Sequence, residues 1–344
     1  MSAVHVVVPE GVHDPEHPSG GNTYDRKICA GLTALGWSVH EHAVMGRWPS
    51  PDASALAALA DVLAEIPDRS VVLLDGLVAS TVPQLLVPQT GRLCLVVLVH
   101  MPLGGTREGA VLEAAAAVIA TSDWTRRWLL DTHGLPAARV QVAKPGVDPA
   151  APAEGTPGGG ELLCVGAYTQ AKGYDVLLAA LVGVRDLRWR CRCVGTLTGD
   201  STFVDHLGRA ASAVGIEDRV RFTGPLAGPE LDHAYASADV LVLASRAETY
   251  GMVVTEALAR GLPVIATAVG GLPEALGHAG EGSRPGLLVP PGDPERFAVA
   301  LRCWLTDAEL RQRLRWAALE RRGTLSPWSD TSMRLSRVLA GVTP

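Results

Sequence analysis

Residues 240–267 read VLVLASRAETYGMVVTEALARGLPVIAT and contain one complete strand–helix–strand unit. The apolar run 240–244 is short and rich in valine and leucine, which predicts a buried strand. After a polar loop, the segment 251–260 is typical of a helix, and Gly261 is well placed to end it. Because Pro263 prevents the helix from continuing, the next apolar run begins a second strand at once. Two strands joined by a helix in this way run parallel in one sheet.

The same alternation of apolar runs and helical segments extends over the whole chain. The other runs expected as strands are 4–8, 39–44, 71–74, 93–99, 118–120, 140–143, 162–165, 190–194, 220–223 and 287–289. The other main segments expected as helices are 22–35, 53–66, 123–133, 173–181, 203–214 and most of 294–342. Ser122 is expected to cap the third of these helices and Gly134 to end it. Apolar strands without polar alternation indicate parallel sheets covered on both faces, so we predict an α/β fold with doubly wound sheets.

The stretch 149–160, PAAPAEGTPGGG, interrupts this alternation. Its density of proline and glycine is typical of a linker. We therefore predict two tandem Rossmann-like domains that face a central cleft, an N-terminal one over residues 1–148 and a C-terminal one over 161–325. In such sheets, ligands bind beyond the carboxyl ends of the strands. Residues 326–344 are expected to form a C-terminal helix that packs back on the N-terminal domain.

The composition is that of an ordinary globular protein. The chain has 344 residues, of which 47% are hydrophobic and 19% charged, with a formal net charge of −6. A nucleic-acid-binding domain usually carries an excess of basic residues, so nucleic acid is not an expected partner. The chain opens on an apolar run without a basic leader, and its run 93–99 is too short to span a bilayer. We expect a cytoplasmic protein with at most peripheral membrane contact.

Six cysteines are scattered along the chain, and only Cys191 and Cys193 are close in sequence. Most of them lie in apolar runs, where cysteine behaves as a small hydrophobic residue. No histidine or cysteine partner stands at the spacing of a zinc site, so we expect structural thiols and no metal.

Two glutamates of the opening segment stand at chemically useful places. Glu248 precedes the expected helix 251–260, and Glu256 lies inside it. The N-terminus of that helix would present free N–H groups to an anion, and Gly251 would let a ligand approach the backbone. Carboxylates suit sugar or ribose hydroxyls, since they accept two hydrogen bonds at once. Taken singly, each glutamate is explained as well by the helix dipole or by solvation.

The pattern around these glutamates closely resembles the Glu-x7-Glu signature of family 4 retaining glycosyltransferases. The resemblance includes Ser245 before it and the Gly-x-Pro-Val after it, while Tyr250 stands where the family usually has phenylalanine. Further stretches resemble landmarks of the family in the correct order. They are PSGGNT at 18–23, VGAYTQAKG at 165–173, RFTGPL at 221–226, GGLPE at 270–274 and GLLVPPGD at 286–293. The resemblance implies the GT-B fold of two Rossmann-like domains.

The resemblance also implies a site for a nucleoside diphosphate sugar, with UDP or GDP as the carrier. Lys172 would lie against the diphosphate, Glu248 near the sugar and Glu256 near the ribose. The family usually has an arginine where this chain has Ala167, so either Arg246 replaces that cation or the phosphates rely on Lys172 and backbone amides. The donor-binding residues that the resemblance implies are Gly20, Gly21, Gly166, Lys172, Arg246, Glu248, Tyr250, Gly251, Met252, Val253 and Glu256.

His100 follows the apolar run 93–99, within LVHMP at 98–102. A single histidine at the end of a strand is more often structural. The family, however, has a histidine at this point that faces the reacting carbon. The resemblance therefore implies His100, Glu248 and Lys172 as the catalytic residues.

The implied activity is transfer of a hexosyl group from the donor to a hydroxyl of an unidentified acceptor, with retention of configuration. No Asp-x-Asp metal motif is evident, so we expect protein groups rather than a metal ion to neutralise the diphosphate, and we expect no cofactor. Same-face attack is expected, with the leaving diphosphate helping to accept the acceptor's proton.

Other functions are compatible with parts of this pattern. A dinucleotide-dependent dehydrogenase would need Gly-x-Gly-x-x-Gly directly after the first strand, but 9–19 intervene here and the third glycine is missing. A nucleotide-sugar epimerase or a sugar phosphorylase would share the same cleft. A non-catalytic protein would bind the nucleotide sugar without turning it over.

Overall fold

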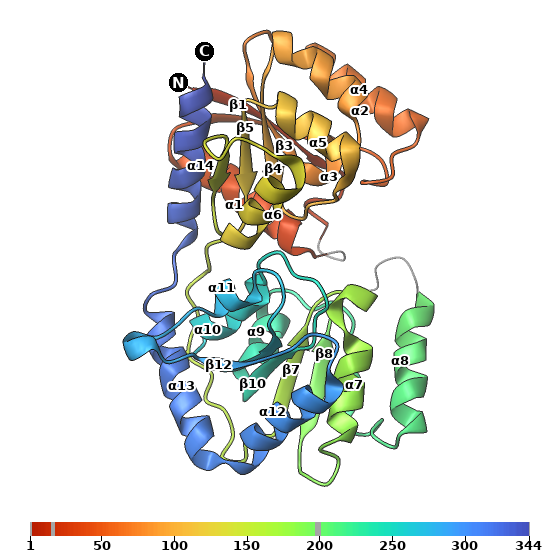
Figure 1. The fold of residues 1–344 in the computed structure, drawn as a ribbon, viewed down its shortest axis with the longest axis vertical. Coiled ribbons are helices and arrows are strands. Elements are labelled where there is room, and N and C mark those ends of the chain that lie inside the picture. Colours follow the sequence, from red (N-terminus) through yellow and green to blue (C-terminus); the bar gives the residue numbers. More distant parts are fainter. Residues whose placement is uncertain (1, 15–17, 197–200, 344) are drawn as a thin grey trace. The chain divides into compact units, whose positions relative to one another are not determined.

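The computed structural model describes residues 2–14, 18–196 and 201–343. The chain divides into two compact units, each with its own sheet (Figure 1). The first unit contains the N-terminal residues up to Asp14, the segment Ser19–Gly146 and the C-terminal residues from Ser326. The second contains Val147–Leu325. Both sheets are six-stranded and parallel, so the predicted doubly wound α/β fold is confirmed.

The first sheet has the strand order β2-β1-β3-β4-β5-β6. Its strands are β1 (Ala3–Pro9), β2 (Ser38–Val44), β3 (Val71–Asp75), β4 (Cys94–Val99), β5 (Ala117–Ala120) and β6 (Val140–Val142). Alternate residues of a strand point to opposite faces, so that Val6 and Leu73 join one buried cluster while Val7 and Leu74 join another. The order reverses between β1 and β3, and ligands of such sheets bind beyond the carboxyl ends of the strands at this point.

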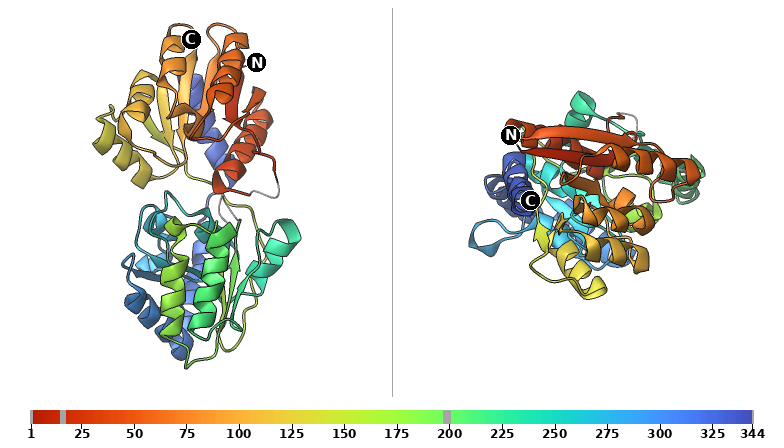
Figure 2. Two further views of the ribbon diagram at one scale, coloured as in Figure 1. Left: turned by 90° about the vertical axis from the view of Figure 1, so that its right-hand side faces the viewer. Right: turned by 90° about the horizontal axis from the view of Figure 1, so that it is seen from above.

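Helices cover both faces of this sheet (Figure 2). They are α1 (Gly20–Ala34), α2 (Ala53–Glu65), α3 (Gly76–Ala79), α4 (Pro83–Leu86), the 3-10 turn η1 (Val87–Gly91), α5 (Gly105–Ala114), α6 (Asp123–His133) and α14 (Trp328–Val342). The caps expected for α6 are confirmed, because Ser122 accepts a hydrogen bond from the N–H of Thr125 and Gly134 is left-handed. The helices expected from the sequence did not include α3, α4 or α5, and the first two of these are too short for an apolar periodicity.

The last helix, α14, belongs to the core of the first unit. Its Leu335 and Leu339 are fully buried in the cluster that includes residues of β1 and β3. Two polar contacts hold it in place, since Thr331 donates to the carbonyl of Lys144 at 2.8 Å and the indole of Trp37 donates to the hydroxyl of Ser336 at 2.8 Å. The apolar face of α14 thus completes a core that the preceding elements of the unit leave open.

The second sheet has the strand order β12-β11-β10-β7-β8-β9, which reverses between β7 and β10. Its strands are β7 (Glu161–Val165), β8 (Arg190–Val194), β9 (Val220–Phe222), β10 (Val240–Leu243), β11 (Val264–Thr267) and β12 (Gly286–Val289). The helical elements are η2 (Gln170–Lys172), α7 (Tyr174–Val182), α8 (Ser201–Ala213), α9 (Gly228–Ala236), α10 (Met252–Ala259), α11 (Leu272–Leu276), η3 (Gly280–Gly282), α12 (Pro294–Thr306) and α13 (Ala308–Arg322). The segment 240–267 therefore forms the expected strand–helix–strand unit.

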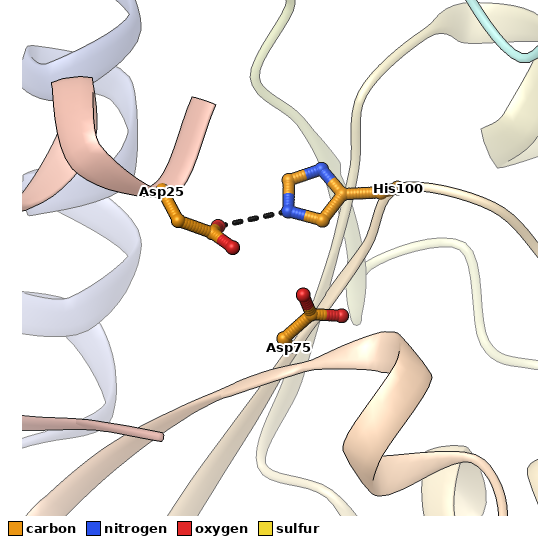
Figure 3. Close-up of side chains that lie close together, drawn as sticks. All are labelled: Asp25, Asp75 and His100. Carbon is orange, nitrogen blue, oxygen red and sulfur yellow. Dashed lines mark hydrogen bonds and ion pairs between the residues drawn. The ribbon is translucent and has the colours of Figure 1, made fainter. Parts of the chain in front are cut away.

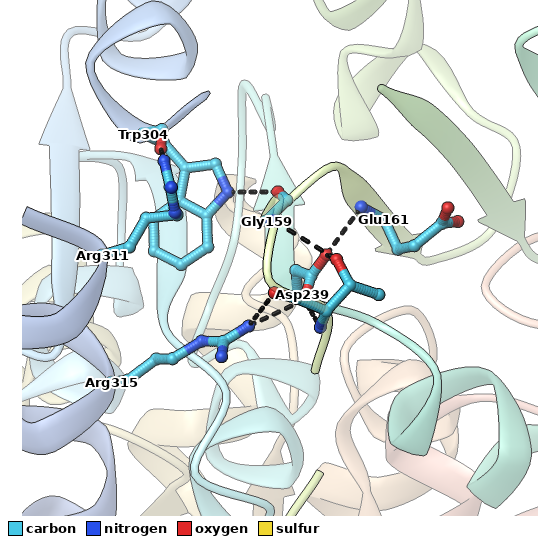
Figure 4. A network of polar contacts seen from close by, with 7 residues as sticks. Gly159, Glu161, Asp239, Trp304, Arg311 and Arg315 are labelled. Atoms are coloured by element: carbon cyan, nitrogen blue, oxygen red, sulfur yellow. Dashed lines mark hydrogen bonds and ion pairs between the residues drawn. The ribbon is translucent and has the colours of Figure 1, made fainter. Parts of the chain in front are cut away.

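The segment 149–160, expected as a linker, packs within the second unit (Figure 4). Asp239, which is fully buried just before β10, accepts hydrogen bonds from the N–H and the hydroxyl of Thr156 and from the N–H of Glu161. Arg315 of α13 donates to the same carboxylate at 2.7 Å. The indole of Trp304 in α12 donates to the carbonyl of Gly159 at 2.7 Å. One buried carboxylate therefore ties this segment to β10 and α13.

Among the described residues, no helix combines the length and the apolar character needed to cross a membrane. All six cysteines are free thiols, as expected. The side chains of Cys191 and Cys193 lie on one face of β8, buried, with their sulfur atoms 3.9 Å apart.

Candidate functional site

The loop between β10 and α10 lies at the carboxyl end of the second sheet, beside the point where the strand order reverses. Its backbone packs closely on two glycines of the GGLPE stretch. The N–H of Gly271 donates to the carbonyl of Glu248 at 3.1 Å. A Cβ atom on Gly270 would lie 1.6 Å from the same oxygen, and Gly270 has a φ of +56°. Only glycine fits there, so these two residues hold Glu248 at the strand ends.

Lys172 and Glu248 form an ion pair in this loop region. Nζ of Lys172 donates to Oε1 of Glu248 at 2.5 Å, and the hydroxyl of Ser245 donates to the same oxygen at 3.3 Å. The side chain of Glu248 is 9% exposed and that of Lys172 is 28% exposed, so water screens the pair only in part. Gly166 follows β7 and lies against the stem of Lys172. The fold thus brings Lys172 to Glu248, which lies 76 residues away in the sequence.

The helix α10 begins directly after this loop. Gly251 is its N-terminal cap with a φ of +93°, and no side chain caps the helix. The N–H groups of Met252 and Val253 belong to the first turn and have no partner within the helix. Tyr250, the predicted donor-binding aromatic residue, is largely buried. The N-terminus of α10 therefore presents backbone donors four and five residues after Glu248.

Glu256 lies in the middle of α10 and is held by a buried tyrosine. The hydroxyl of Tyr235 in α9 donates to Oε2 of Glu256 at 2.7 Å. Burial raises the pKa of Glu256, while the bond from Tyr235 and the nearby charge of Arg260 oppose this rise. The Arg260 guanidinium stacks on the ring of Tyr235, 4.5 Å from its centre, and also pairs with Asp232. One carboxylate oxygen of Glu256 is thus committed to the protein.

Arg246, considered as a replacement for the cation missing at Ala167, is engaged elsewhere. Its guanidinium binds both carboxylate oxygens of Asp175, at 2.7 and 2.6 Å, and the carbonyl of Gln170 at 3.0 Å. This hydrogen-bonded pairing lowers the pKa of Asp175. Both cations are therefore paired with a carboxylate, and Lys172 is the one whose partner is the predicted site residue Glu248.

In the first unit, His100 meets two carboxyl groups at the strand ends (Figure 3). It follows β4, while Asp75 ends β3 and Asp25 lies in α1, which follows β1. Nε2 of His100 lies 2.8 Å from Oδ1 of Asp25. The side chains of His100 and Asp25 are 12% and 3% exposed. Gly21, in the first turn of α1, lies against the His100 ring, since a Cβ there would be 3.5 Å from Cδ2.

The charge state of this cluster follows from its burial. Burial by itself lowers the pKa of His100, but the charge and hydrogen bond of Asp25, together with Asp75, outweigh it and raise that pKa to about 9. Burial also raises the pKa of Asp75, against the opposing charge of His100, and Asp25 adds to the rise. The cluster therefore favours a protonated imidazole at neutral pH.

The residues predicted from sequence are divided between the two units. Gly20, Gly21 and His100 belong to the first unit, where Gly20 opens α1. The others belong to the second unit, where the structure brings Gly166, Lys172 and Glu248 together and places Glu256 with Tyr235. A hollow of about 440 Å³ lies beside the predicted 221–226 loop. It is lined by Arg192, Arg221, Thr223, Leu226, Pro229, Glu230 and His233.

Sequence reasoning missed Asp25, Asp75, Asp175 and Tyr235. For Asp75 a signal existed, because a carboxylate that ends the otherwise apolar run VVLLD at 71–75 is unusual. The other three lie inside helices, Asp25 in α1, Asp175 in α7 and Tyr235 in α9. Their partners are between 21 and 75 residues away in sequence, so no local pattern marks them.

Comparison with known proteins gives a consistent result. Residues 154–321 match the model of the family described as glycosyl transferases group 1. The D-inositol 3-phosphate glycosyltransferase of Kineococcus radiotolerans is 37% identical over 248 residues, which are 65% of this chain and 57% of that protein. The chain thus spans less than two thirds of the length of this curated relative.

Two solved structures show the same fold over the whole chain. The sucrose-phosphate synthase of Thermosynechococcus elongatus has a TM-score of 0.80 at 21% identity, over 99% of both chains. The Anabaena protein HepE in complex with UDP-glucose has a TM-score of 0.76 at 17% identity, over 99% of this chain and all of that one. The segment 154–321 therefore matches the glycosyl transferases of group 1, and the chain has the GT-B fold.

Proposed function

We propose that this protein is a retaining hexosyltransferase that moves a sugar from a nucleoside diphosphate to a hydroxyl of an acceptor. The observation that carries the proposal is the Lys172–Glu248 ion pair, in which Glu248 stands four residues before the first residue of α10. The match to the group 1 family supports sugar transfer. The fold shared with a protein in complex with UDP-glucose supports a nucleotide-sugar donor, with UDP or GDP as carrier.

In this proposal the second unit binds the donor. The Lys172 ammonium and the first-turn N–H groups of α10 hold the diphosphate, where they stabilise the negative charge that develops as the sugar leaves. Glu248 accepts hydrogen bonds from sugar hydroxyls, and Glu256 uses the oxygen that Tyr235 leaves open for the ribose. Each group then has a role that its residue type can fill.

We further propose that the reaction needs no metal ion and that the acceptor attacks the face from which the nucleotide leaves. The positive charge of Lys172 and the dipole of α10 take the role that a divalent cation has in metal-dependent transferases. The leaving diphosphate, the strongest nearby base in this scheme, takes the proton of the acceptor hydroxyl. His100 of the first unit acts on the transferred sugar.

A screen of nucleotide sugars tests this function. We expect one UDP- or GDP-hexose to raise the melting temperature and to be turned over when acceptors are added, with D-inositol 3-phosphate tried first because relatives carry its name. Turnover should persist in excess EDTA, and NMR should show retention at the anomeric carbon. Dependence on inorganic phosphate would indicate a phosphorylase, and donor conversion without acceptor an epimerase. Binding without any turnover would indicate a non-catalytic protein.

Tyr235→Phe should weaken nucleotide binding through Glu256. Loss of the Tyr235 hydrogen bond costs about 0.5–1.5 kcal/mol, so we expect roughly 3–10-fold weaker affinity by calorimetric titration. The same change raises the pKa of Glu256 further, because the bond favours the ionised form. The defect should therefore be larger at low pH and shrink as pH rises. Tyr24→Phe, which loses a 2.8 Å bond to the carbonyl of Ala143 in the first unit, is the control. Equal affinities in both variants would disprove the role given to Glu256.

A further inference from the structure

The cluster of Asp25, Asp75 and His100 contains two carboxyl groups that the proposed transfer does not use. We infer that Asp25 and Asp75 are positioning residues that keep His100 doubly protonated, so that its side chain acts as a hydrogen-bond donor and not as a base. This inference rests on the proposed function for its catalytic meaning. Its structural part concerns the first unit alone.

The geometry fixes which ring nitrogen faces a carboxylate. Nε2 of His100 lies 2.8 Å from Oδ1 of Asp25, and an ionised carboxylate can only accept, so Nε2 carries a hydrogen. Figure 3 shows Nδ1 on the opposite side of the ring from both carboxyl groups. A proton on Nδ1 therefore points away from Asp25 and Asp75 and is available to a ligand.

The second carboxyl group increases the demand for a positive charge. One oxygen of Asp25, one oxygen of Asp75 and one nitrogen of His100 lie within 4.8 Å of one another, and both aspartates are 3% exposed. Oδ2 of Asp25 is the one buried side-chain polar atom in the described part of the chain that has no hydrogen-bond partner. Two buried carboxyl groups beside a neutral imidazole would carry uncompensated negative charge, which is costly at such burial. A cationic His100 beside these carboxyl groups lowers this cost.

The neighbouring titratable groups agree with this assignment. Asp25 and Asp75 raise the pKa of His100 to about 9 in spite of its burial. Tyr24 of α1 packs edge-on against the His100 ring, with 5.0 Å between ring centres. Burial raises the pKa of the Tyr24 hydroxyl well above its usual value, so it stays neutral. Asp25, Asp75 and Tyr24 are thus the ionisable groups that face His100 from α1 and β3.

A doubly protonated His100 limits which group can take the proton of the acceptor hydroxyl during the transfer. A doubly protonated imidazole has no free lone pair, so His100 cannot take that proton. It can donate from Nδ1 to an oxygen of the transferred sugar. The proton of the acceptor must then go to the leaving diphosphate, which is the same-face scheme proposed above.

NMR titration of the histidine ring nitrogens tests the inference without any substrate. We expect the His100 midpoint near pH 9 in the native protein and a fall of about two units or more in Asp25→Asn, because burial then acts without its main opposing charge. Asp75→Asn should cause a smaller fall. His133, which pairs with Glu108 at 3.0 Å in the same unit, is the internal control and should not move.

Several outcomes would overturn the inference. These are a neutral His100 at pH 7.5 in the native protein, or a midpoint that neither variant lowers. Binding of Mn²⁺ or Zn²⁺ with release of the Nε2 proton would also overturn it, since a cation would then occupy the cluster. If Asp25→Asn does not fold, the titration of His100 in Asp75→Asn tests the inference instead. A His100 midpoint unchanged from the native protein would then show that Asp75 does not help to keep His100 protonated.

The pH dependence of kcat then links the charge to the reaction. A donor must be protonated, so native activity should fall only as pH rises through about 9. In Asp25→Asn the fall should begin at least two pH units lower, and Asp25→Glu should restore part of the native profile. A variant that loses activity equally at every pH would show a merely structural role. The protein could also show the NMR midpoints expected above and yet have no transferase activity. That result would refute the proposed function but would still support the charge assigned to His100.

Discussion

Replacing Lys172 with alanine should lower kcat for sugar transfer by about 10²–10³-fold, the usual effect of removing one preorganised group that stabilises developing charge. It should also weaken binding of the nucleoside diphosphate. The reason is that Lys172 is the cation that contacts Glu248 at the carboxyl ends of the strands. Removal of the ammonium also leaves the largely buried Glu248 carboxylate without its partner.

Steady-state kinetics and calorimetric titration measure the two effects. Lys172→Met keeps the aliphatic stem that lies against Gly166 and removes only the charge, so it should be nearly as defective as Lys172→Ala. Lys144→Ala is the matched control, because this lysine also pairs with a carboxylate, Asp123 at 2.8 Å, but belongs to the first unit. Unchanged diphosphate affinity in both Lys172 variants would remove the proposed donor site.

Replacing Asp239 with alanine should destabilise the second unit by about 3–5 kcal/mol, because it leaves a charged group and several buried donors unpaired. Arg315 loses its carboxylate, and the N–H groups of Thr156 and Glu161 lose their acceptor. For a unit of this size the melting temperature should fall by roughly 10 °C. Differential scanning calorimetry measures this effect directly.

A second aspartate–arginine pair of the same unit provides the control. Asp186 binds Arg302 through both carboxylate oxygens, but both side chains are substantially exposed. Exposed pairs contribute little, so Asp186→Ala should melt close to the native protein. Similar melting temperatures for the Asp239 and Asp186 variants would show that burial of Asp239 does not have the energetic weight assigned here.

The strands and the longer helices could mostly be predicted because their signals are local. The run 240–244 and the segment 251–260 carry their own apolar patterns, and Ser122 and Gly134 act on the helix next to them. Boundaries were less accurate. The helix expected at 22–35 begins at Gly20, because Ser19 caps it. The helical stretch expected at the C-terminus is divided at Asp307 into α12 and α13.

The candidate site could be predicted only in part. The resemblance named Lys172, Glu248 and Glu256, but not that Lys172 binds Glu248 or that Tyr235 occupies one oxygen of Glu256. The partners of these residues come from other strands and helices, so their choice depends on how the sheet orders those elements. The segment 149–160 shows the same limit, since its composition is typical of a linker while Asp239 holds it to the second unit.

By itself the sequence determined that this chain forms two α/β units, each with a sheet of parallel strands. It could do so because apolar runs, helix caps and glycines act on the structure of the few residues around them. It also determined that a Glu-x7-Glu pattern stands before and within a helix at a strand end. Only the tertiary structure decided which charges meet. Strand orders that reverse at β1/β3 and at β7/β10 bring distant carboxylates, Lys172 and His100 to the carboxyl ends of the strands. Burial at these strand ends removes the water that would screen the charges. The protonation state of each group therefore depends on its neighbours in space rather than in sequence.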